Sequence, residues 1–470
     1  MAHNMKIMNP QAGTRINRSA PKTLAVVLWV LSGLPAHAQY ATRSQPTVTL
    51  LYTFRTSGTP TAFVEVNPGL FWGVAATGGQ IFSITASGRY NTVYTFPPVP
   101  SGITILGLTA ALNGYLYGGY SSSGTTQIAD LFASTLKGLV TLHAYNGATQ
   151  GGPNYVVQYP DDNLYTFFGV TGSTTNTFTR LDYGGKTTDL YTLTPAQGVP
   201  RAPFIGIDGN FYGISLMGNT AQLGIYRLMT SGAFSWVVPS MPTGKFGVNH
   251  GIALMQATNG KFFGTLPQGG AANAGTIYEA NLDGNYKTIY QFDNLQFGIP
   301  ETLIQASDGM LYGTARGEFG GGYTGYSSVF RVNPSTGQFK TIYNFTNALI
   351  GECECILTQG TDGKLYGADF NAGTYVGGTI FVMDLGLPKP LPHVANIIPR
   401  IGSAGQSILL FGDGFLGATA VSFNGTPATT LIVPSHQGIR ATVPSGATTG
   451  PITVTTPNGS FTTKISFTVQ

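Results

Sequence analysis

Residues 308–313 read DGMLYG, and this short stretch recurs along most of the chain. Close copies are DGKLYG at 362–367 and DGNFYG at 208–213. Looser copies are NGKFFG (259–264), NGYLYG (113–118), DDNLYT (161–166) and NPGLFWG (67–73). Seven copies therefore follow one another between residues 67 and 367, at intervals of 45 to 54 residues.

Each residue type in this stretch favours a tight turn followed by a buried strand. Asp-Gly and Asn-Gly tolerate the positive φ that tight hairpins require. The Leu and Tyr that follow point to opposite faces, so a sheet buried on both sides receives an apolar side chain on each. The Gly after Tyr leaves room for a neighbouring backbone or ring. We therefore expect each copy to join two strands through a hairpin turn.

Three further apolar runs accompany each copy, and all of them are short, alternating and bounded by turn residues. TIYQF at 288–292 and the run at 302–306 are examples. No window sustains the i, i+3, i+4, i+7 pattern of a helix. Four strands in about 40–50 residues is the signature of a β-propeller blade. A β-helix would need a much shorter repeat period, so it is a much less favoured interpretation than the propeller.

The two ends of the repeat region complement each other. The seventh copy stops after its third strand at 378–382, whereas an unassigned strand at 48–54 precedes the first copy. If this strand completes the last blade, the ring closes and leaves no open sheet edge. The prediction is an all-β fold: a seven-bladed β-propeller over residues 46–388, closed by the N-terminal strand.

The first 38 residues have the features of a cleaved export signal. Arg15, Arg18 and Lys22 precede the apolar run at 24–31, and residues 36–38 form an A-x-A cleavage site. That run is far short of the ~18–20 residues of a membrane span, and no later stretch could serve as one. We expect a secreted or cell-surface protein.

The composition of the chain argues against nucleic acid as a partner. Charged residues make up 9% of the chain and the net charge is +4, with no basic run after residue 22. Nucleic acid binding needs a clustered basic surface, so it is not expected.

The tail after the proline-rich residues 388–394 lacks the repeat. Residues 391–470 contain short strands at 407–411, 420–423, 439–443, 452–455 and 464–469, with Asn-Gly turn signals between them. About eighty residues of this kind predict a small β-sandwich of immunoglobulin type.

Two family resemblances follow from these motifs. The stretch QASDGMLYGT at 305–314, with the Tyr-x-Phe strands, resembles the GloVer tandem repeat of bacterial secreted and surface-anchored proteins. The tail resembles an IPT/TIG domain through FGDGF at 411–415, ATAVSFNG at 418–425 and VPSGA at 443–447. The first resemblance implies a propeller-like extracellular repeat region without a settled activity. The second implies an interaction or spacer module.

The sequence carries few signs of a catalytic or metal-binding site. The four histidines after residue 38 are scattered, and no Gly-x-Ser-x-Gly, phosphate loop, zinc spacing or calcium loop is present. We therefore predict no catalytic residue, cofactor or metal site. The Asp of each repeat is explained by the hairpin. Cys353 and Cys355, the only cysteines, are either two packed thiols or a strained disulfide.

One glycine-rich loop, at 316–326, stands out between the second and third strands of the sixth copy. Aromatic side chains there could stack on sugars or a peptide, with charged groups at the rim. The candidate ligand-binding residues are Arg316, Glu318, Phe319, Tyr323 and Tyr326. The alternative is an insertion without a binding role.

The sequence is compatible with two functions. The first is a secreted or cell-surface non-enzymatic binding or scaffold protein, whose ligand is a polysaccharide or a surface protein. The second is a carbohydrate-active enzyme, a hydrolase or lyase, with a site on the propeller axis. Paired carboxylates meeting at the axis would favour the enzyme.

Overall fold

The computed structural model describes residues 46–55, 60–75, 79–96, 103–110, 115–122, 128–135, 138–146, 152–159, 161–169, 176–217, 222–242, 253–293, 299–316, 327–345, 356–369 and 377–470. The regular secondary structure of these residues is β-strand, apart from one 3-10 turn, η1 (Pro195–Gln197). A helix long and apolar enough to cross a membrane does not occur among them. The predicted export signal and both cysteines lie outside these ranges.

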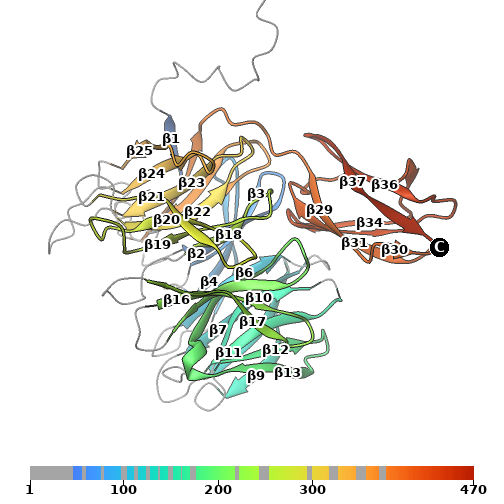
Figure 1. The fold of residues 1–470 in the computed structure, drawn as a ribbon, viewed down its shortest axis with the longest axis horizontal. Coiled ribbons are helices and arrows are strands. Elements are labelled where there is room, and N and C mark those ends of the chain that lie inside the picture. Colours follow the sequence, from blue (N-terminus) through green and yellow to red (C-terminus); the bar gives the residue numbers. More distant parts are fainter. Residues whose placement is uncertain are drawn as a thin grey trace, which may run out of the picture. The chain divides into compact units, whose positions relative to one another are not determined.

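Seven four-stranded antiparallel sheets precede residue 385 in the described ranges (Figure 1). Six of them are made of strands that follow one another in the chain. The first three comprise β2 (Pro60–Asn67), β3 (Leu70–Ala75), β4 (Gln80–Thr85), β5 (Tyr90–Thr95); β6 (Ile103–Ala110), β7 (Leu116–Ser122), β8 (Ile128–Thr135), β9 (Gly138–Asn146); and β10 (Gly152–Gln158), β11 (Leu164–Gly169), β12 (Asn176–Leu181), β13 (Thr187–Leu193).

The next three sheets repeat this order. They comprise β14 (Val199–Ile205), β15 (Phe211–Leu216), β16 (Gln222–Leu228), β17 (Phe234–Pro242); β18 (Leu254–Gln256), β19 (Phe262–Leu266), β20 (Thr276–Ala280), β21 (Tyr286–Gln291); and β22 (Ile299–Gln305), β23 (Leu311–Arg316), β24 (Ser328–Val332), β25 (Phe339–Asn344).

The seventh sheet draws its fourth strand from the other end of the chain. Its own strands are β26 (Ile356–Gln359), β27 (Leu365–Asp369) and β28 (Thr379–Asp384), and β1 (Thr47–Thr53) pairs antiparallel with β28. The register places Thr47 opposite Asp384 and Thr53 opposite Thr379.

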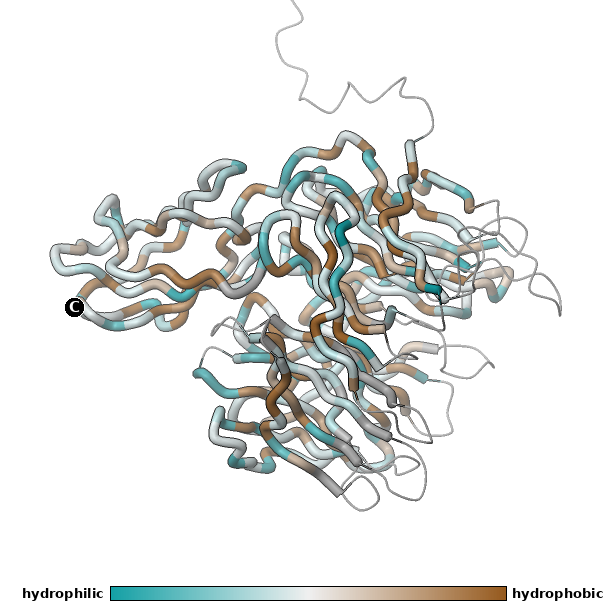
Figure 2. Tube along the Cα trace, turned by 180° about the vertical axis from the view of Figure 1, so that it is seen from behind, coloured by the Kyte–Doolittle hydropathy of each residue, from teal (hydrophilic) through white to brown (hydrophobic). Residues whose placement is uncertain are grey.

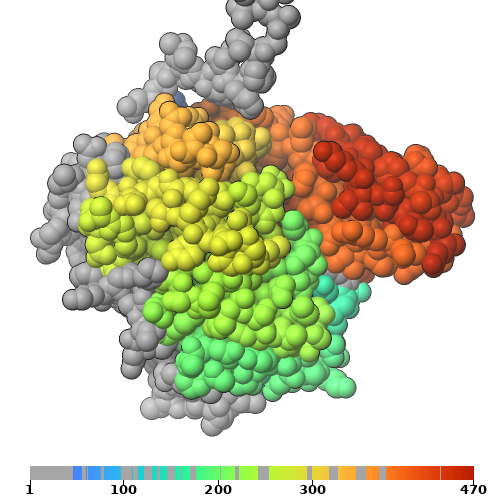
Figure 3. Space-filling view, viewed as in Figure 1, coloured from blue at the N-terminus to red at the C-terminus, as the bar shows by residue number. Residues whose placement is uncertain are grey.

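Apolar clusters join each sheet to the next, and the seventh sheet to the first. Hydrophobic residues recur along the whole coloured trace (Figure 2), and segments that follow one another in the sequence lie next to one another on the visible surface (Figure 3). Each of these clusters contains residues of two neighbouring sheets. One such pair from each cluster, in chain order, is Trp72 and Phe132, Tyr117 and Leu164, Phe167 and Tyr226, Ile214 and Phe262, Ile277 and Phe330, Val329 and Phe381, and Tyr366 and Phe71.

The repeated Asp has a structural role in the turn between the first and second strands of a sheet, which we call the first turn. In the sixth sheet, Asp308 Oδ1 accepts the Met310 N–H at 3.0 Å, and the Tyr312 hydroxyl donates to Asp308 Oδ2 at 2.9 Å. The intervening Gly309 has a φ of 78°. The third, fourth and seventh sheets repeat the Tyr–Asp bond. The Asp is therefore fixed as part of the framework.

The Gly after Tyr is required by a close approach, as the sequence predicts. A Cβ on Gly313 would overlap the Phe330 ring and the Thr302 carbonyl oxygen. The ring at the Phe330 position is Phe in most sheets but Tyr226 and Tyr278 in the fourth and fifth. Both tyrosine hydroxyls are fully buried and have no hydrogen-bond partner among the described residues.

The C-terminal domain is a sandwich of two sheets. One has the order β29-β31-β35-β34 and the other β30-β37-β36-β32-β33. The strands are β29 (His393–Ile398), β30 (Ile401–Gly402), β31 (Ser407–Asp413), β32 (Ala420–Phe423), β33 (Thr426–Pro427), β34 (Leu431–Ser435), β35 (Gly438–Thr442), β36 (Gly450–Thr456) and β37 (Gly459–Val469). Ile408, Phe423, Ile452 and Phe467 are among its core residues.

The strands predicted from the sequence correspond to the longer strands of this domain, except that β29 and β34 were not predicted. β29 begins at His393, inside the stretch interpreted as a proline-rich linker. Its Val394 and Ile397 are buried in the sandwich core, and this burial stabilises the strand despite the neighbouring prolines.

We predict that Tyr278→Phe stabilises the protein. An unpaired buried hydroxyl carries a desolvation penalty, so its removal should raise the free energy of unfolding by about 1 kcal/mol. Urea unfolding monitored by circular dichroism measures this. The reverse change in the neighbouring sheet, Phe330→Tyr, is the matched control and should destabilise. A Tyr278→Phe protein less stable than the parent would contradict the prediction.

Candidate functional site

The first turns meet at one end of the first strands, and glutamine side chains connect them. Gln305 Oε1 accepts the Thr258 N–H of the preceding sheet at 3.0 Å, while its Nε2 donates to Gly309 O of its own turn at 3.2 Å. Gln256 makes the same two bonds, to Ile207 N and Gly260 O. One side-chain amide thus fixes both its own turn and its neighbour's. We call this arrangement the amide bridge.

Gln359 extends the arrangement to the seventh sheet and to the chain that leaves it. Its Oε1 accepts the Ser307 N–H at 2.8 Å, and its Nε2 donates to Gly363 O at 3.1 Å and Pro388 O at 3.3 Å. Pro388 lies in the segment that leads to the C-terminal domain. The last amide bridge therefore also holds the start of that segment.

A carboxylate occupies the glutamine position at the junction of the seventh sheet with the first. Glu65, which is 5% exposed, accepts the Thr361 N–H at 2.8 Å and the Thr361 hydroxyl at 2.9 Å. A carboxylate has no N–H to donate, so Glu65 accepts the Gly69 N–H at 2.7 Å instead of contacting a carbonyl. Burial raises the pKa of Glu65, and these three hydrogen bonds offset part of that rise.

The junction between the third and fourth sheets uses a different group. The glutamine position of the fourth sheet is Ile205, which cannot bridge two turns. There the Tyr159 hydroxyl of the third sheet donates to Gly209 O of the fourth-sheet turn at 2.8 Å.

The C-terminal domain contacts the first turns directly. Asn458 Nδ2 donates to Thr361 O in the seventh-sheet turn at 2.9 Å and to Pro390 O at 3.1 Å. Arg440 pairs with Asp162 of the third-sheet turn. The ends of the first strands therefore face this domain rather than open solvent.

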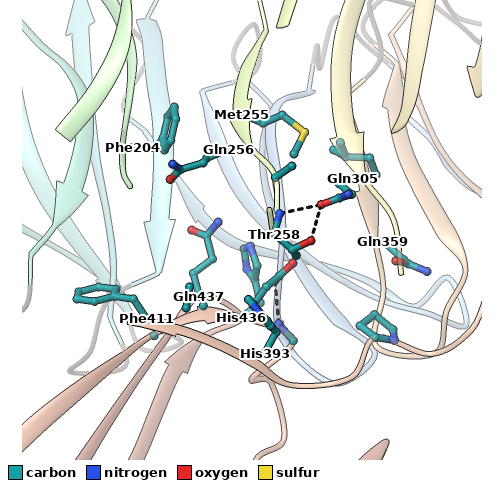
Figure 4. A pocket seen from close by; sticks show the side chains of 18 of the residues that line it. Phe204, Met255, Gln256, Thr258, Gln305, Gln359, His393, Phe411, His436 and Gln437 are labelled. Atoms are coloured by element: carbon teal, nitrogen blue, oxygen red, sulfur yellow. Dashed lines mark hydrogen bonds between the residues drawn. The ribbon is translucent and has the colours of Figure 1, made fainter. Parts of the chain in front are cut away.

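A cavity of about 680 Å³ lies between the first strands and the C-terminal domain. Figure 4 shows Phe204, Met255 and Gln256 on one side of it and Phe411, Gln437 and His436 on the other. The dashed lines between Gln305 and Thr258 mark the bonds from the Thr258 N–H and hydroxyl to Gln305 Oε1.

One repeated position lines this cavity with a residue type that varies among the sheets. It lies immediately before the glutamine position, nine residues before the Gly that follows the Tyr. Six of its seven occupants line the cavity, namely Thr109, Val157, Phe204, Met255, Ile304 and Thr358. The bridging glutamines also line the cavity, so its wall combines a repeated amide position with a position that varies among Thr, Val, Phe, Met and Ile.

The charged groups at the cavity are few. Of the described lining residues, Glu65 and Asp413 are carboxylates, Lys389 is a cation, and none is arginine. Burial lowers the pKa of His393, opposed by the nearby Asp413 carboxylate. The Glu65 oxygens are occupied by the turn hydrogen bonds. The lining is dominated by amide, hydroxyl and apolar groups.

The binding loop proposed from the sequence is only partly described. Glu318, Phe319, Tyr323 and Tyr326 lie outside the described residues. Arg316 is the last residue of β23 and is 5% exposed, so it is not at an exposed loop rim. Arg316 Nε lies 3.6 Å from Glu301 Oε1, and this pair is far from the first turns in strand register.

Sequence reasoning did not identify the cavity. Gln256, Gln305 and Gln359 each stand eight residues before the Gly that follows the Tyr, and Glu65 and Gln158 occupy the same position in their copies. That regularity was a usable signal for the amide bridges. Groups of three or more potential metal ligands do not occur among the described residues.

Comparison with known families agrees with the repeat and the tail. The Gloeobacter/Verrucomicrobia repeat matches residues 104–324 and 200–389, and the IPT/TIG domain matches residues 392–469. Both family resemblances predicted from the sequence are therefore confirmed. No curated protein matches the chain.

Solved structures resemble the chain at low sequence identity. Virginiamycin B lyase from Staphylococcus aureus is 14% identical with a TM-score of 0.51, covering 72% of this chain and 99% of that chain. A streptogramin B lyase has the same identity and TM-score, covering 72% and 98%. The BP39L lectin from Burkholderia pseudomallei is 12% identical with a TM-score of 0.52, covering 70% and 97%. These are β-propeller proteins, and the likeness concerns the fold alone.

We predict that Glu65→Gln makes stability less dependent on pH. The pKa of Glu65 is raised above its ordinary value of 4.5 in the folded chain, so its stabilising contribution is present below pH 4.5 and is lost as the pH rises through the raised value. A glutamine does not titrate and can form the amide bridge seen at Gln305. The stability advantage of the variant should therefore grow as the pH rises above 4.5.

Chemical unfolding at a series of pH values from 4 to 7 measures this difference. Gln305→Glu is the matched control, because it introduces a carboxylate opposite the Gly309 carbonyl and should destabilise increasingly over the same range. Parallel profiles for Glu65→Gln and the parent would show that Glu65 does not titrate as described.

Proposed function

The chain belongs to the Gloeobacter/Verrucomicrobia repeat family and ends in an IPT/TIG domain, and we propose that it is a non-enzymatic binding or scaffold protein that acts outside the cytoplasm. Its ligand is a carbohydrate or a surface protein. Its repeat region is a closed seven-bladed propeller, and its C-terminal domain holds one end of the central cavity. Residues 1–38 act as the export signal in this proposal.

The cavity lining is the observation that carries this proposal. A hydrolase of sugars needs two carboxyl groups placed on either side of the bond that it breaks. Among the described lining residues only Glu65 and Asp413 are carboxylic acids, and Glu65 is engaged by three hydrogen bonds from neighbouring turns. Amides and half-buried aromatic rings suit recognition better than bond cleavage.

The similar solved structures are compatible with either a binding or an enzymatic role. They include a protein named a lectin and proteins named lyases. The lectin supports a carbohydrate as the ligand class, and the carboxylates of the described lining argue against a hydrolase.

Fractionation followed by a binding assay tests this function. The exported chain should begin at Gln39 and should bind at least one glycan on an array, or one protein from a cell-envelope pull-down, without releasing a shortened product. A chain that stays cytoplasmic, that binds nothing in either assay, or that cleaves a bound glycan would contradict the proposal.

We also predict that ring closure depends on β1. A chain beginning at residue 56 lacks the strand that pairs with β28, so the seventh sheet would expose the unpaired edge of β28 and lose the apolar contacts of Leu50 and Phe54. It should aggregate or melt without cooperativity in differential scanning calorimetry. A chain beginning at residue 46 is the matched control. A monomeric chain from residue 56 with unchanged melting would refute ring closure.

A further inference from the structure

The cavity at the first turns has the size and the composition of a ligand site. Its volume of about 680 Å³ falls within the range of about 300–1,000 Å³ that small-molecule sites occupy. Its walls come from the first strands on one side, and from β29, β31 and the turn before β35 on the other. A ligand held there would touch two domains at once.

Two amides in the wall are held in place and still have hydrogen-bonding capacity. A glutamine amide has two N–H donors and an oxygen with two lone pairs. Among bonds between described residues, Gln256 uses one N–H and accepts one bond, and Gln305 uses one N–H and accepts two bonds at its oxygen. Each therefore retains an N–H for a ligand hydroxyl. Because the amide bridges fix both side chains, a ligand would not have to order them.

Aromatic rings stand on both sides of the same cavity. Phe204, at the end of β14, is half-buried, and its ring centroid lies 6.3 Å from those of Tyr212 and Phe262. Phe411, in β31, is also half-buried and is not part of the sandwich core. Both rings line the cavity and have surface left to contact a ligand. An aromatic face packs well against the C–H face of a pyranose ring.

The charges argue against an ionic ligand. Phosphate and carboxylate groups are typically bound by arginine, which is absent from the described lining. The buried carboxylate is already satisfied, and Lys389 and Asp413 have opposite signs. Hydroxyl-matching amides together with two aromatic faces fit an uncharged, polyhydroxylated molecule.

We propose that this cavity binds a neutral oligosaccharide between the propeller and the IPT/TIG domain. The inference rests on the proposed binding function and adds its site and its ligand class. The amides of Gln256 and Gln305 bond to sugar hydroxyls, and the rings of Phe204 and Phe411 pack on sugar faces. The variable cavity-facing position selects the sugar, since its side chains range from Thr and Val to Met and Phe among the sheets.

Two variants address the cavity without breaking an amide bridge. Phe411→Ala removes one ring, and Ala395→Trp adds bulk at a half-buried residue that lines the cavity. Tyr286→Ala removes an aromatic ring that is 41% exposed on β21 and does not line the cavity, so it is the control. Melting temperature and circular dichroism establish that all three proteins are folded.

The experiment is titration calorimetry of the full exported chain with neutral malto-, cello-, xylo- and chito-oligosaccharides, from tri- to hexasaccharides. The parent should bind at least one series, and Phe411→Ala should raise the Kd about tenfold. Ala395→Trp should abolish binding, and Tyr286→Ala should leave the Kd unchanged. Uronic acid oligosaccharides of the same length should bind more weakly than the neutral series.

The outcomes separate this inference from the proposed function. Saccharide binding that persists in folded Phe411→Ala and Ala395→Trp overturns the cavity as the site while the binding function stands. A parent that binds only a surface protein, or acidic saccharides in preference, overturns the ligand class alone. A parent that binds neither saccharide nor protein overturns both proposals.

Discussion

The side-chain amide that bridges two neighbouring turns is the interaction on which the repeat architecture depends. Apolar clusters press adjacent sheets together, but hydrophobic contact is not directional and leaves the relative position of two sheets loosely defined. Gln305 adds direction because its two ends bond to backbone groups of different sheets. Backbone groups at these turns would otherwise be exposed at the rim of the cavity. The bridge satisfies them and sets the register between sheets.

Variations on the bridge follow from the hydrogen-bonding inventory of each side chain. Glutamine can accept from one turn and donate to another, whereas glutamate can only accept when ionised. Each bridging glutamine donates an N–H to a carbonyl of its own turn. Glu65 instead accepts the N–H of Gly69 in its own turn. At Ile205 no bridge is possible, and Tyr159 reaches across from the preceding sheet. These junctions use different chemical groups, but each of them links the first turns of two neighbouring sheets.

The local structure was largely predictable from the sequence, because it depends on residues close together in the chain. The Asp-Gly turn, the buried Leu and Tyr and the Gly under a neighbouring ring are local features with local causes. β29 was missed because prolines flank it and its burial comes from distant strands. The cavity was missed for a related reason. Phe204, Gln305 and Phe411 are brought together only by the arrangement of separate sheets, which no spacing in the sequence encodes.

Two adjacent positions in the first strand have different roles, because one carries a repeated residue and the other varies between sheets. The glutamine position makes the bridges, so exchanging it would disturb the contact between sheets. The position just before it makes no such bridge and points toward the cavity, where Thr109, Phe204 and Met255 occupy equivalent places. Such a position can change without loss of the framework, and each change alters one part of the cavity wall. A scaffold of this kind can therefore keep its fold while its ligand changes, and in this chain the C-terminal domain supplies the remaining wall.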